Sequence, residues 1–282
     1  MRFENTGLID LHTHTTASDG SCTPAELVRY AAGKGLKAIA VTDHDTLDGL
    51  PEAQREAKKL GLEVIPGVEI SVDFKPEMHM LGYFLQGDCS GIQGVLRELA
   101  EKRAERNPKI VKRLNELGME ITMDEVEALS GNGITGRPHI ARVMIDKGYA
   151  ASVEEAFEKY LASGRPAYFS KEKLTPAQGI DAITKAGGLP VLAHPIFLNR
   201  SGQEMDALLR ELAGAGLRGI EAYYSENTEE QTRELLQLAA RHKLFVTGGS
   251  DYHGSFKPNI DIGVGKGNLT VPYGLLETMK GL

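Results

Sequence analysis

The stretch LIDLHTHTTASDGSCTPAELVRYAAGKGLKAIAVTDHD, residues 8–45, contains the pattern that decides the fold. Its apolar run at 8–11 predicts a strand. The segment 23–26, TPAE, has the pattern of a capping box with proline at the first helical position, so a helix is expected over 24–34, ended by the glycine that follows. The apolar run 38–42 predicts a second strand. Strand, helix and strand in this order are typical of parallel α/β folds.

The same alternation continues along the chain with one interruption. Further strands are expected at 63–70, 78–85, 189–193, 219–222 and 244–247, and further helices at 51–60, from 175, at 204–213 and at 228–242. From about 90 to 167 the pattern is helical, with Pro108 expected to kink or divide the first helix. We therefore expect an α/β fold, a parallel sheet or barrel of six or seven strands built by 1–89 and 168–282, with an all-helical insert at 90–167.

The composition is that of an ordinary globular protein, with 282 residues of which 41% are hydrophobic and 25% charged. No apolar run approaches the roughly 18–20 residues of a membrane span, and the N-terminus lacks a signal-peptide pattern, so a cytoplasmic protein without membrane association is expected. The net charge of −7 disfavours duplex DNA as a partner. Cys22 and Cys89 lack CxxC spacing and are expected to be structural thiols. No obligate protein partner is indicated.

Six of the eight histidines lie beside acidic residues near the ends of predicted strands. In chain order these polar groups are His12, His14 and Asp19, then Asp43, His44 and Asp45, then Glu69, His79, His194, Asp251 and His253. Because the carboxyl ends of barrel strands share one face, the groups would meet in one cleft. Imidazole and carboxylate are ligands of zinc, manganese and iron, and such cations would relieve the repulsion among the acids. A satisfied polar core is the alternative, which a single His-x-His motif alone would favour.

The motifs DLHTHTTASDG, AVTDHDTLDG, PGVEIS, HMLGY, LAHP and GSDYHG follow the order of those in the PHP (polymerase and histidinol phosphatase) family. The chain resembles that family over about 7–86 and 175–267. The resemblance implies a distorted (β/α)7 barrel with a trinuclear metal centre. It implies one ion at His12, His14, Glu69 and Asp251, a second at Glu69, His79 and His194, and a third at Asp19, His44 and His253.

The resemblance leaves the details of this centre open. Other branches of the family place a histidine at the position of Asp19, so two or three divalent ions per chain are expected. Manganese is expected first, with zinc, iron or magnesium as alternatives. Asp43 and Asp45 are expected to orient His44 and to fix its tautomer, and capping of the loop at the strand end is the alternative.

Within the expected insert, the segment 135–141, TGRPHIA, resembles the PHP branch that contains 3′,5′-nucleotide bisphosphate phosphatases and the related 5′–3′ exoribonuclease, ribonuclease AM. The insert would then cover the metal cleft and help to bind substrate. Arg137 would clamp a phosphate with its planar guanidinium, and His139 would donate to a phosphate or protonate a leaving oxygen. The alternatives are a surface ion pair for Arg137 and a place on a helix surface for His139.

Three other features are less specific. Lys102, Arg106, Lys109 and Arg113 follow helical spacing and could face a phosphate backbone, but interspersed glutamates favour a solvated face of mixed charge. Tyr223 and Tyr224, past a strand end, could stack on a base or pack under the insert. Glu221, at the same strand end, shows no motif that would make it a ligand.

Together these patterns favour a metal-dependent hydrolase acting on a small phosphorylated nucleotide. It would remove the 3′ phosphate of a 3′,5′-bisphosphorylated nucleotide such as pAp and leave the 5′ monophosphate. A short RNA with a 5′ phosphate could lose mononucleotides in the same cleft. The alternatives are a histidinol-phosphate phosphatase, an accessory nuclease domain of a polymerase, and a metal-stabilised binding protein without catalysis.

Overall fold

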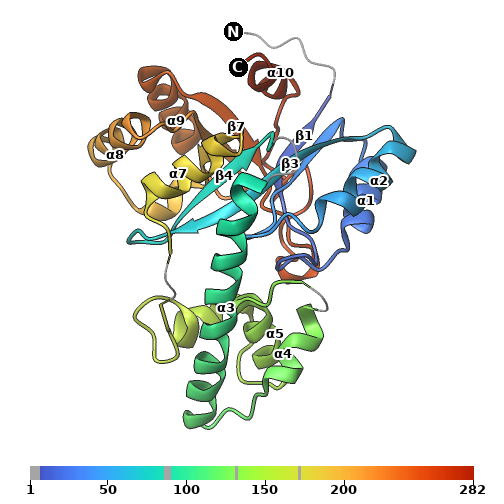
Figure 1. Ribbon diagram of the computed structural model, residues 1–282, viewed down its shortest axis with the longest axis vertical. Helices are drawn as coiled ribbons and strands as arrows, with labels where there is room; N and C mark the ends of the chain where they lie inside the picture. Colours follow the sequence, from blue (N-terminus) through green and yellow to red (C-terminus); the bar gives the residue numbers. More distant parts are fainter. Residues whose placement is uncertain (1–6, 86–89, 131–132, 171–172) are drawn as a thin grey trace.

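The computed structural model describes residues 7–85, 90–130, 133–170 and 173–282, and its centre is one curved sheet (Figure 1). Seven strands follow one another in chain order across this sheet: β1 (Ile9–Thr13), β2 (Ala38–Val41), β3 (Glu63–Val72), β4 (Met78–Tyr83), β5 (Leu189–Leu192), β6 (Gly219–Tyr224) and β7 (Phe245–Gly249). The two edges meet, because Thr13 bridges to Tyr252 and the amide of Asp251 donates to the carbonyl of His12. A side chain at Gly249 would collide with His12, so only glycine fits there. The sheet is therefore a nearly closed barrel.

One strand runs against the others. β4 pairs antiparallel with both β3 and β5, whereas the other neighbouring strands are parallel. The connection at 73–77 is too short for a crossover helix, and a hairpin is the connection that such a length permits. The expectation of a parallel sheet is thus wrong for β4. Its register pairs Ser71 with His79, so the start of β4 lies beside the end of β3.

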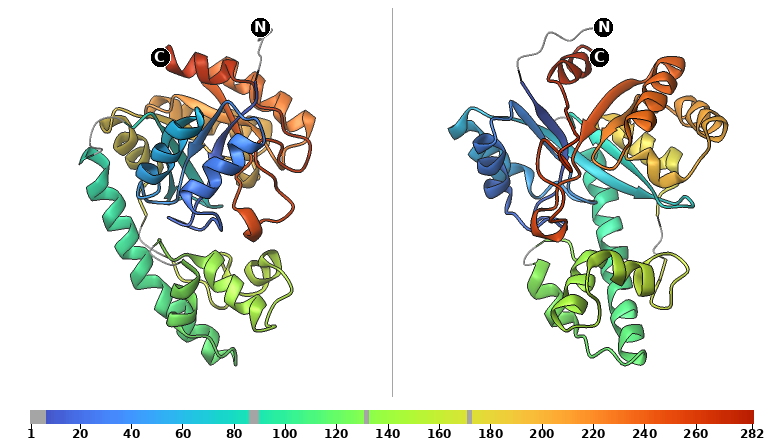
Figure 2. Two further views of the ribbon diagram at one scale, coloured as in Figure 1. Left: turned by 90° about the vertical axis from the view of Figure 1, so that its right-hand side faces the viewer. Right: turned by 180° about the vertical axis from the view of Figure 1, so that it is seen from behind.

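Helices lie on the outside of the barrel, and all but the last follow the predicted boundaries closely. They are α1 (Pro24–Gly33), α2 (Leu50–Leu60), α7 (Pro176–Lys185), α8 (Gly202–Gly214), α9 (Glu229–His242) and α10 (Gly274–Lys280). The capping box predicted at Thr23 forms, capping boxes at Thr175 and Thr228 also start α7 and α9, and Gly61 ends α2 in the left-handed conformation. The short helix α10 was not predicted. It lies at the end of the barrel opposite the helices that come between β4 and α7 in the chain (Figure 2).

Three apolar cores hold the barrel together: one packs α1 and α2 against β2, and the other two lie inside and outside the rest of the sheet. The second core contains Leu11 of β1 and Tyr83 of β4, strands that are not neighbours, so this core fills the inside of the curved sheet. The hydroxyl of Tyr83 donates to the carbonyl of Leu11 at 2.7 Å across it. The third core joins the outer face of β3 and β4 to α7, α8 and α9. All three cores leave polar side chains at the strand ends free to form a site.

Between β4 and α7 the described residues form helices and no strand. They are α3 (Ser90–Glu116), α4 (Met123–Ser130), α5 (Arg137–Asp146), α6 (Val153–Ala156) and a π-helical turn, η1 (Phe157–Leu161). Figures 1 and 2 show this group beside one end of the barrel, with α3 extending along both. The expected division of α3 at Pro108 is wrong. Leu99 packs in the core under the barrel helices and Ile110 in a separate core of the helical group, and packing at both ends holds the helix continuous.

Among the helices within the described ranges, none is long and apolar enough to cross a bilayer.

Candidate metal centre and active-site cavity

Glu69 of β3 is the carboxylate around which the histidines gather. Its side chain is 1% exposed. Five imidazole nitrogens lie 2.8–3.3 Å from its two oxygens, one each from His12, His14, His44, His79 and His194. They come from β1, from the loops after β2 and β5, and from β4. The antiparallel direction of β4 is what brings His79 to this end of the barrel.

His12 of β1 and His14, which directly follows this strand, enter the cluster together. They are two residues apart along an extended segment, so their rings point to the same side. Nε2 of His14 lies 3.3 Å from Oδ1 of Asp251, and Nε2 of His12 lies 3.6 Å from it. With Glu69 they form a group of four whose ligand atoms lie within 4.8 Å of one another. The group holds the four residues that the family resemblance assigns to the first ion.

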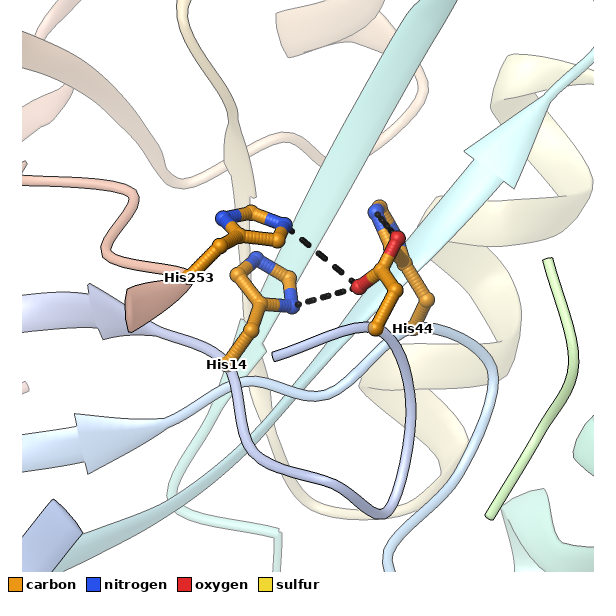
Figure 3. A group of neighbouring side chains, drawn as sticks. His14, His44 and His253 are labelled. Carbon is orange, nitrogen blue, oxygen red and sulfur yellow. Dashed lines mark ion pairs between the residues drawn. The ribbon is translucent and has the colours of Figure 1, made fainter. Parts of the chain in front are cut away.

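A second group surrounds the carboxylate of Asp19. Figure 3 shows His14, His44 and His253 pointing toward one carboxylate from three separate segments. The distances from ring nitrogens to Asp19 oxygens are 3.6 Å for His14, 3.7 Å for His44 and 3.4 Å for His253. Nδ1 of His253 donates to the carbonyl of Asp251 at 2.8 Å, which leaves a lone pair on the Nε2 that faces Asp19.

The remaining ligand-type residues, His79 and His194, both contact Oε1 of Glu69. Glu69, His44 and His79 form a third group of ligand atoms within 4.8 Å of one another. Nε2 of His194 lies 2.9 Å from the same Glu69 oxygen that His79 contacts. His194 has φ of +25°, a conformation rare for non-glycine residues, which turns the chain directly after β5. All nine predicted ligand residues therefore lie in one continuous cluster.

The donor set and its spacing fit divalent cations. Buried ring nitrogens of three histidines have no hydrogen-bond partner in the described part of the chain: Nε2 of His12, Nε2 of His14 and Nδ1 of His44. Atoms that bind one ion at about 2.0–2.2 Å lie roughly 3.0–3.6 Å from each other. The nitrogen-to-oxygen distances of 3.2–3.6 Å around Glu69 and Asp251 fall in that range. Nitrogen and oxygen ligands together suit zinc, manganese or iron.

Charges within the cluster compensate one another. Burial opposes ionisation of Glu69, but the surrounding imidazoles outweigh burial and hold its pKa well below the ordinary value. Burial lowers the pKa of His44 to about 3, so this ring is neutral and keeps a free lone pair. Burial also acts against the protonated form of His79, but the carboxylate of Glu69 prevails and raises the pKa of that histidine to about 9. Glu69 is thus ionised at neutral pH, as cation binding requires.

Glu221 of β6 supports two ligand-type residues and was missed from the sequence. It is fully buried. Its Oε1 lies 3.0 Å from Nδ1 of His12, and its Oε2 accepts from the amide of His194 at 2.7 Å. A carboxylate can only accept, so Nδ1 of His12 carries the proton and Nε2 presents its lone pair to the cluster. No motif marked Glu221, because its role depends on β6 lying between β5 and β7.

Asp251 is held in a comparable way by Tyr224 and Lys257. The Tyr224 hydroxyl donates to Oδ2 of Asp251 at 2.9 Å, and Nζ of Lys257 lies 2.6 Å from the same oxygen. Oδ1 remains directed at His12 and His14. Tyr224 is 2% exposed and its ring lies against those of His194 and Phe197, so the prediction that it stacks on a base is wrong. Tyr223 packs against the core inside the barrel.

Asp43 and Asp45 were predicted to orient His44, but the partners that the structure gives them are different. Asp43 accepts hydrogen bonds of 2.6–2.7 Å from the hydroxyls of Thr15 and Ser18 and from the amide of Thr15. It fixes the loop that carries Asp19, so the alternative of loop capping describes it better than a bond to His44. Asp45 forms an ion pair with Arg103 of α3 at 2.5 Å, which ties the β2 end to the helical group.

The cluster opens into a cavity of about 490 Å³ between the barrel end and the helical group. Arg137 lines this cavity, but its guanidinium already donates to Glu77 at 2.9 Å and to the carbonyl of Leu161 at 3.2 Å. His139 is 1% exposed, so the alternative of a place on a helix surface is wrong. Its Nδ1 accepts from the amide of Gly136 at the start of α5, and it is not among the described residues that line the cavity.

Two arginines of α3 complete the wall opposite the cluster. Arg103 and Arg106 are both buried and both line the cavity. The expected solvated face of mixed charge is therefore wrong for Arg106, while Lys109 of the same series is exposed. Helical spacing alone could not show which face of α3 turns toward the barrel, because charged residues occur on every side of it.

Comparisons with known proteins agree with this geometry. The family model described as PHP domain matches residues 10–253. The chain is 34% identical to the 5′-3′ exoribonuclease Rnm of Escherichia coli (strain K12), covering 87% of this chain and 85% of that protein. It is 30% identical to the 3′,5′-nucleoside bisphosphate phosphatase of Chromobacterium violaceum, covering 90% of each. A protein of Bifidobacterium adolescentis assigned as a metal-dependent phosphoesterase superposes with a TM-score of 0.86 at 32% identity, covering 98% of this chain and 96% of that one.

These likenesses extend over the barrel and the helical group alike, and the cluster supplies the ligand groups that metal-dependent chemistry needs. The protein is a metal-dependent phosphoesterase, and it belongs to the PHP domain family.

Proposed function

We propose that the protein hydrolyses the 3′ phosphate of 3′,5′-bisphosphorylated nucleotides such as pAp and leaves the 5′ monophosphate. One observation carries the proposal: a single cavity has the histidine–carboxylate cluster on one wall and arginines of the helical group on the other. Its volume of about 490 Å³ suits one nucleotide, since small-molecule sites span roughly 300–1,000 Å³. The relative from Chromobacterium violaceum bears the name of this activity.

The ligands of the cluster would hold two or three divalent ions, with manganese as the first choice and zinc, iron or magnesium as alternatives. They are His12, His14, Asp19, His44, Glu69, His79, His194, Asp251 and His253. When bound, such ions supply Lewis acidity that activates water near neutral pH and screens the charge of a phosphoryl group.

The protein's own side chains prepare the cluster and the cavity for that reaction. Glu221 fixes the tautomer of His12, and Tyr224 with Lys257 fixes the direction of Asp251. The arginines present positive charge in fixed positions on the cavity wall, where it stabilises phosphate oxygens without the reorganisation that solvent requires. Phe197, which is 41% exposed and lines the cavity, offers an apolar face for the base or ribose.

The helical group, residues 90–167, acts in this proposal as a cover over a barrel formed by 1–89 and 168–282. The ion pair between Arg103 and Asp45 supports it, because it joins the two parts at the cavity. The separate core around Ile110 supports a distinct unit, whereas Leu99 packs with the barrel helices. A boundary within α3 follows more naturally from this packing than one at its start.

A short RNA with a 5′ phosphate is the second candidate substrate. Removing its first nucleotide cuts a 3′ phosphoester beside a 5′-phosphorylated nucleoside, which is the same bond in the same setting. The Escherichia coli relative is named a 5′-3′ exoribonuclease, and it is 34% identical to this chain, against 30% for the phosphatase relative. The cavity would then hold the terminal nucleotide only.

A substrate panel tests the proposal. The purified protein is incubated with pAp, histidinol phosphate and a 5′-phosphorylated oligoribonucleotide, with manganese, zinc, iron or magnesium in parallel. We expect phosphate release from pAp with formation of AMP. Turnover of histidinol phosphate alone would select the alternative phosphatase. If no substrate releases phosphate or nucleotide with any metal, the protein is not the proposed hydrolase, and metal binding without turnover would point to a binding protein.

A further inference from the structure

Arg106 of α3 is a buried cation that has no carboxylate partner among the residues that the structure describes. Its side chain is 5% exposed and lines the cavity. Its guanidinium donates to Oδ1 of Asn107 at 3.2 Å, and its Nε has no hydrogen-bond partner among the described residues. Across the same residues no acid forms an ion pair with it. A charge removed from water without an opposite charge destabilises the folded state, so such an arrangement needs a reason.

The neighbouring charges do not compensate Arg106, because they are already paired. Asp45 is bound by Arg103 at 2.5 Å, and Glu77 is shared by Arg137 at 2.9 Å and Lys173 at 2.6 Å. Arg103, Arg106 and Arg137 line the cavity on this side, and the first and the last of them are paired with Asp45 and Glu77. Glu154 also lines the cavity, but among the described residues it forms no ion pair with Arg106. Burial, followed by the charges of Arg103 and Arg137, lowers the pKa of Arg106 to about 9, which still leaves it positive at neutral pH.

The unpaired charge is held in a defined position. Asn107 accepts from Arg106 and donates through its own amide to the carbonyl of Thr135 at 2.8 Å, so the pair is tied to the residues before α5. Nε, which has no partner, belongs to the fork of donors that binds two oxygens of a phosphate at once. The site is therefore built for a planar, charge-assisted contact.

We propose that Arg106 is the specificity-determining residue that binds the phosphate the reaction leaves intact, the 5′ phosphate of the nucleotide. The inference rests on the proposed function. The scissile phosphate belongs at the histidine–carboxylate cluster, and Asp19, Glu69 and Asp251 of that cluster form no ion pair with Arg106. The second phosphate of the same nucleotide is then the anion available to the opposite wall of the cavity. Arg137, committed to Glu77, is less free to take this part.

Two substrates that differ only in the 5′ phosphate test the inference. Steady-state rates are measured on pAp and on adenosine 3′-monophosphate for the wild type, Arg106→Met and Arg106→Lys. Methionine keeps the approximate length and apolar stem but removes the charge and the donors. The control is Lys109→Met, which removes an exposed cation about one turn further along α3.

We expect Arg106→Met to lower kcat/KM on pAp by about ten- to a hundredfold, mainly through KM, since hydrogen bonds to charged groups are of that strength. The rate on the 3′-monophosphate should stay within about threefold of the wild type. Arg106→Lys should restore part of the preference, because lysine keeps the charge but not the fork. Lys109→Met should behave as the wild type.

Binding of the product gives a readout independent of turnover. Calorimetry compares AMP with adenosine on the manganese-loaded protein. The wild type should prefer AMP, and Arg106→Met should lose that preference. In the absence of nucleotide the variant should melt at the same temperature as the wild type or higher, because an unpaired buried charge has been removed.

The outcomes separate the inference from the proposed function. An unchanged preference for the 5′ phosphate in Arg106→Met, in both kinetics and binding, overturns the inference and leaves the function intact. Equal losses on both substrates together with a lower melting temperature also overturn it, since they describe a structural arginine. If the wild type hydrolyses neither substrate, the proposed function fails, and AMP binding still decides the role of Arg106.

Discussion

The two walls of the cavity hold charge in opposite ways. On the barrel wall, imidazoles and carboxylates face one another at 2.8–3.7 Å and compensate each other internally. On the wall formed by the helical group, Arg103 and Arg137 are paired with carboxylates, whereas Arg106 has no such partner in the described structure. A phosphorylated nucleotide is the kind of ligand that meets both conditions. Its reacting phosphate needs added cations on the first wall, whereas its other phosphate finds positive charge already present on the second.

The difference also separates what binds metal from what selects substrate. Ligand-type residues of the barrel wall are fixed by strand ends and by buried partners such as Glu221. The arginines lie on α3 and α5, which belong to a group with its own apolar core. Changes on the barrel wall should therefore affect every substrate alike. Changes on the helical wall should distinguish one substrate from another.

Removal of metal should have the largest effect, and it should disable the metal centre on the barrel wall without changing the helical wall. Treatment with a chelator should stop hydrolysis of every substrate, and manganese should restore it. The melting temperature should fall by about 5–10 °C, because a ligand at a hundred times its Kd stabilises by about 2.7 kcal/mol. Differential scanning calorimetry and phosphate release measure both effects. Activity that survives exhaustive chelation would show that the cluster is a polar core and no metal centre.

Glu69→Gln should have the next largest effect. It removes the charge that five histidines approach, so metal content should drop and kcat/KM should fall by at least about a thousandfold. The control is Glu63→Gln on the same strand, where Glu63 contacts Tyr273 and Lys280 near α10. Elemental analysis and steady-state rates compare the two. Equal metal content in Glu69→Gln and the wild type would contradict the central place of Glu69.

The barrel wall could be predicted from the sequence because its information is local. Each ligand-type group follows a short apolar run, and the family motifs gave their order, so His12, His14 and Asp251 needed only the rule that strand ends converge. Helix boundaries were equally predicted from local patterns, such as the capping box at Thr23. The direction of β4 could not be predicted in this way, since periodicity does not show whether neighbouring strands are parallel.

The helical wall could not be predicted because its information is tertiary. Arg103 and Arg106 look like any charged residues of a polar helix until the barrel covers one face of α3. Glu221 likewise became meaningful only when β6 placed it beside His12. Arg137 was singled out by resemblance, and its pairing with Glu77 depends on the β3–β4 connection, which is remote in sequence. The residues missed are those whose partners come from distant elements.

Glu221→Ala should have an intermediate effect. It would show how much the hydrogen-bond partners of the ligand-type residues contribute to metal binding and activity. It leaves Nδ1 of His12 and the amide of His194 without their acceptor. Loss of such outer partners lowers metal affinity or activity by about 10–100-fold. Metal titration and kcat/KM on pAp and the 3′-monophosphate measure it, with Glu230→Ala on the exposed face of α9 as control. A loss confined to one substrate would place Glu221 with substrate selection instead.

Arg137→Ala should have the smallest effect, and it tests most directly which arginine of the helical wall recognises the substrate. Arg137 lines the cavity but is bound to Glu77, so its removal should raise KM for pAp by about three- to tenfold and leave kcat nearly unchanged. Arg142→Ala is the control on the same helix, because Arg142 pairs with Asp146 at the surface. Unchanged KM and kcat would remove Arg137 from the site. A loss of kcat/KM on pAp larger than that of Arg106→Met would reverse the assignment of the two arginines. It would mean that Glu77 releases Arg137 to the phosphate. The paired cation, and not the unpaired one, would then recognise the substrate.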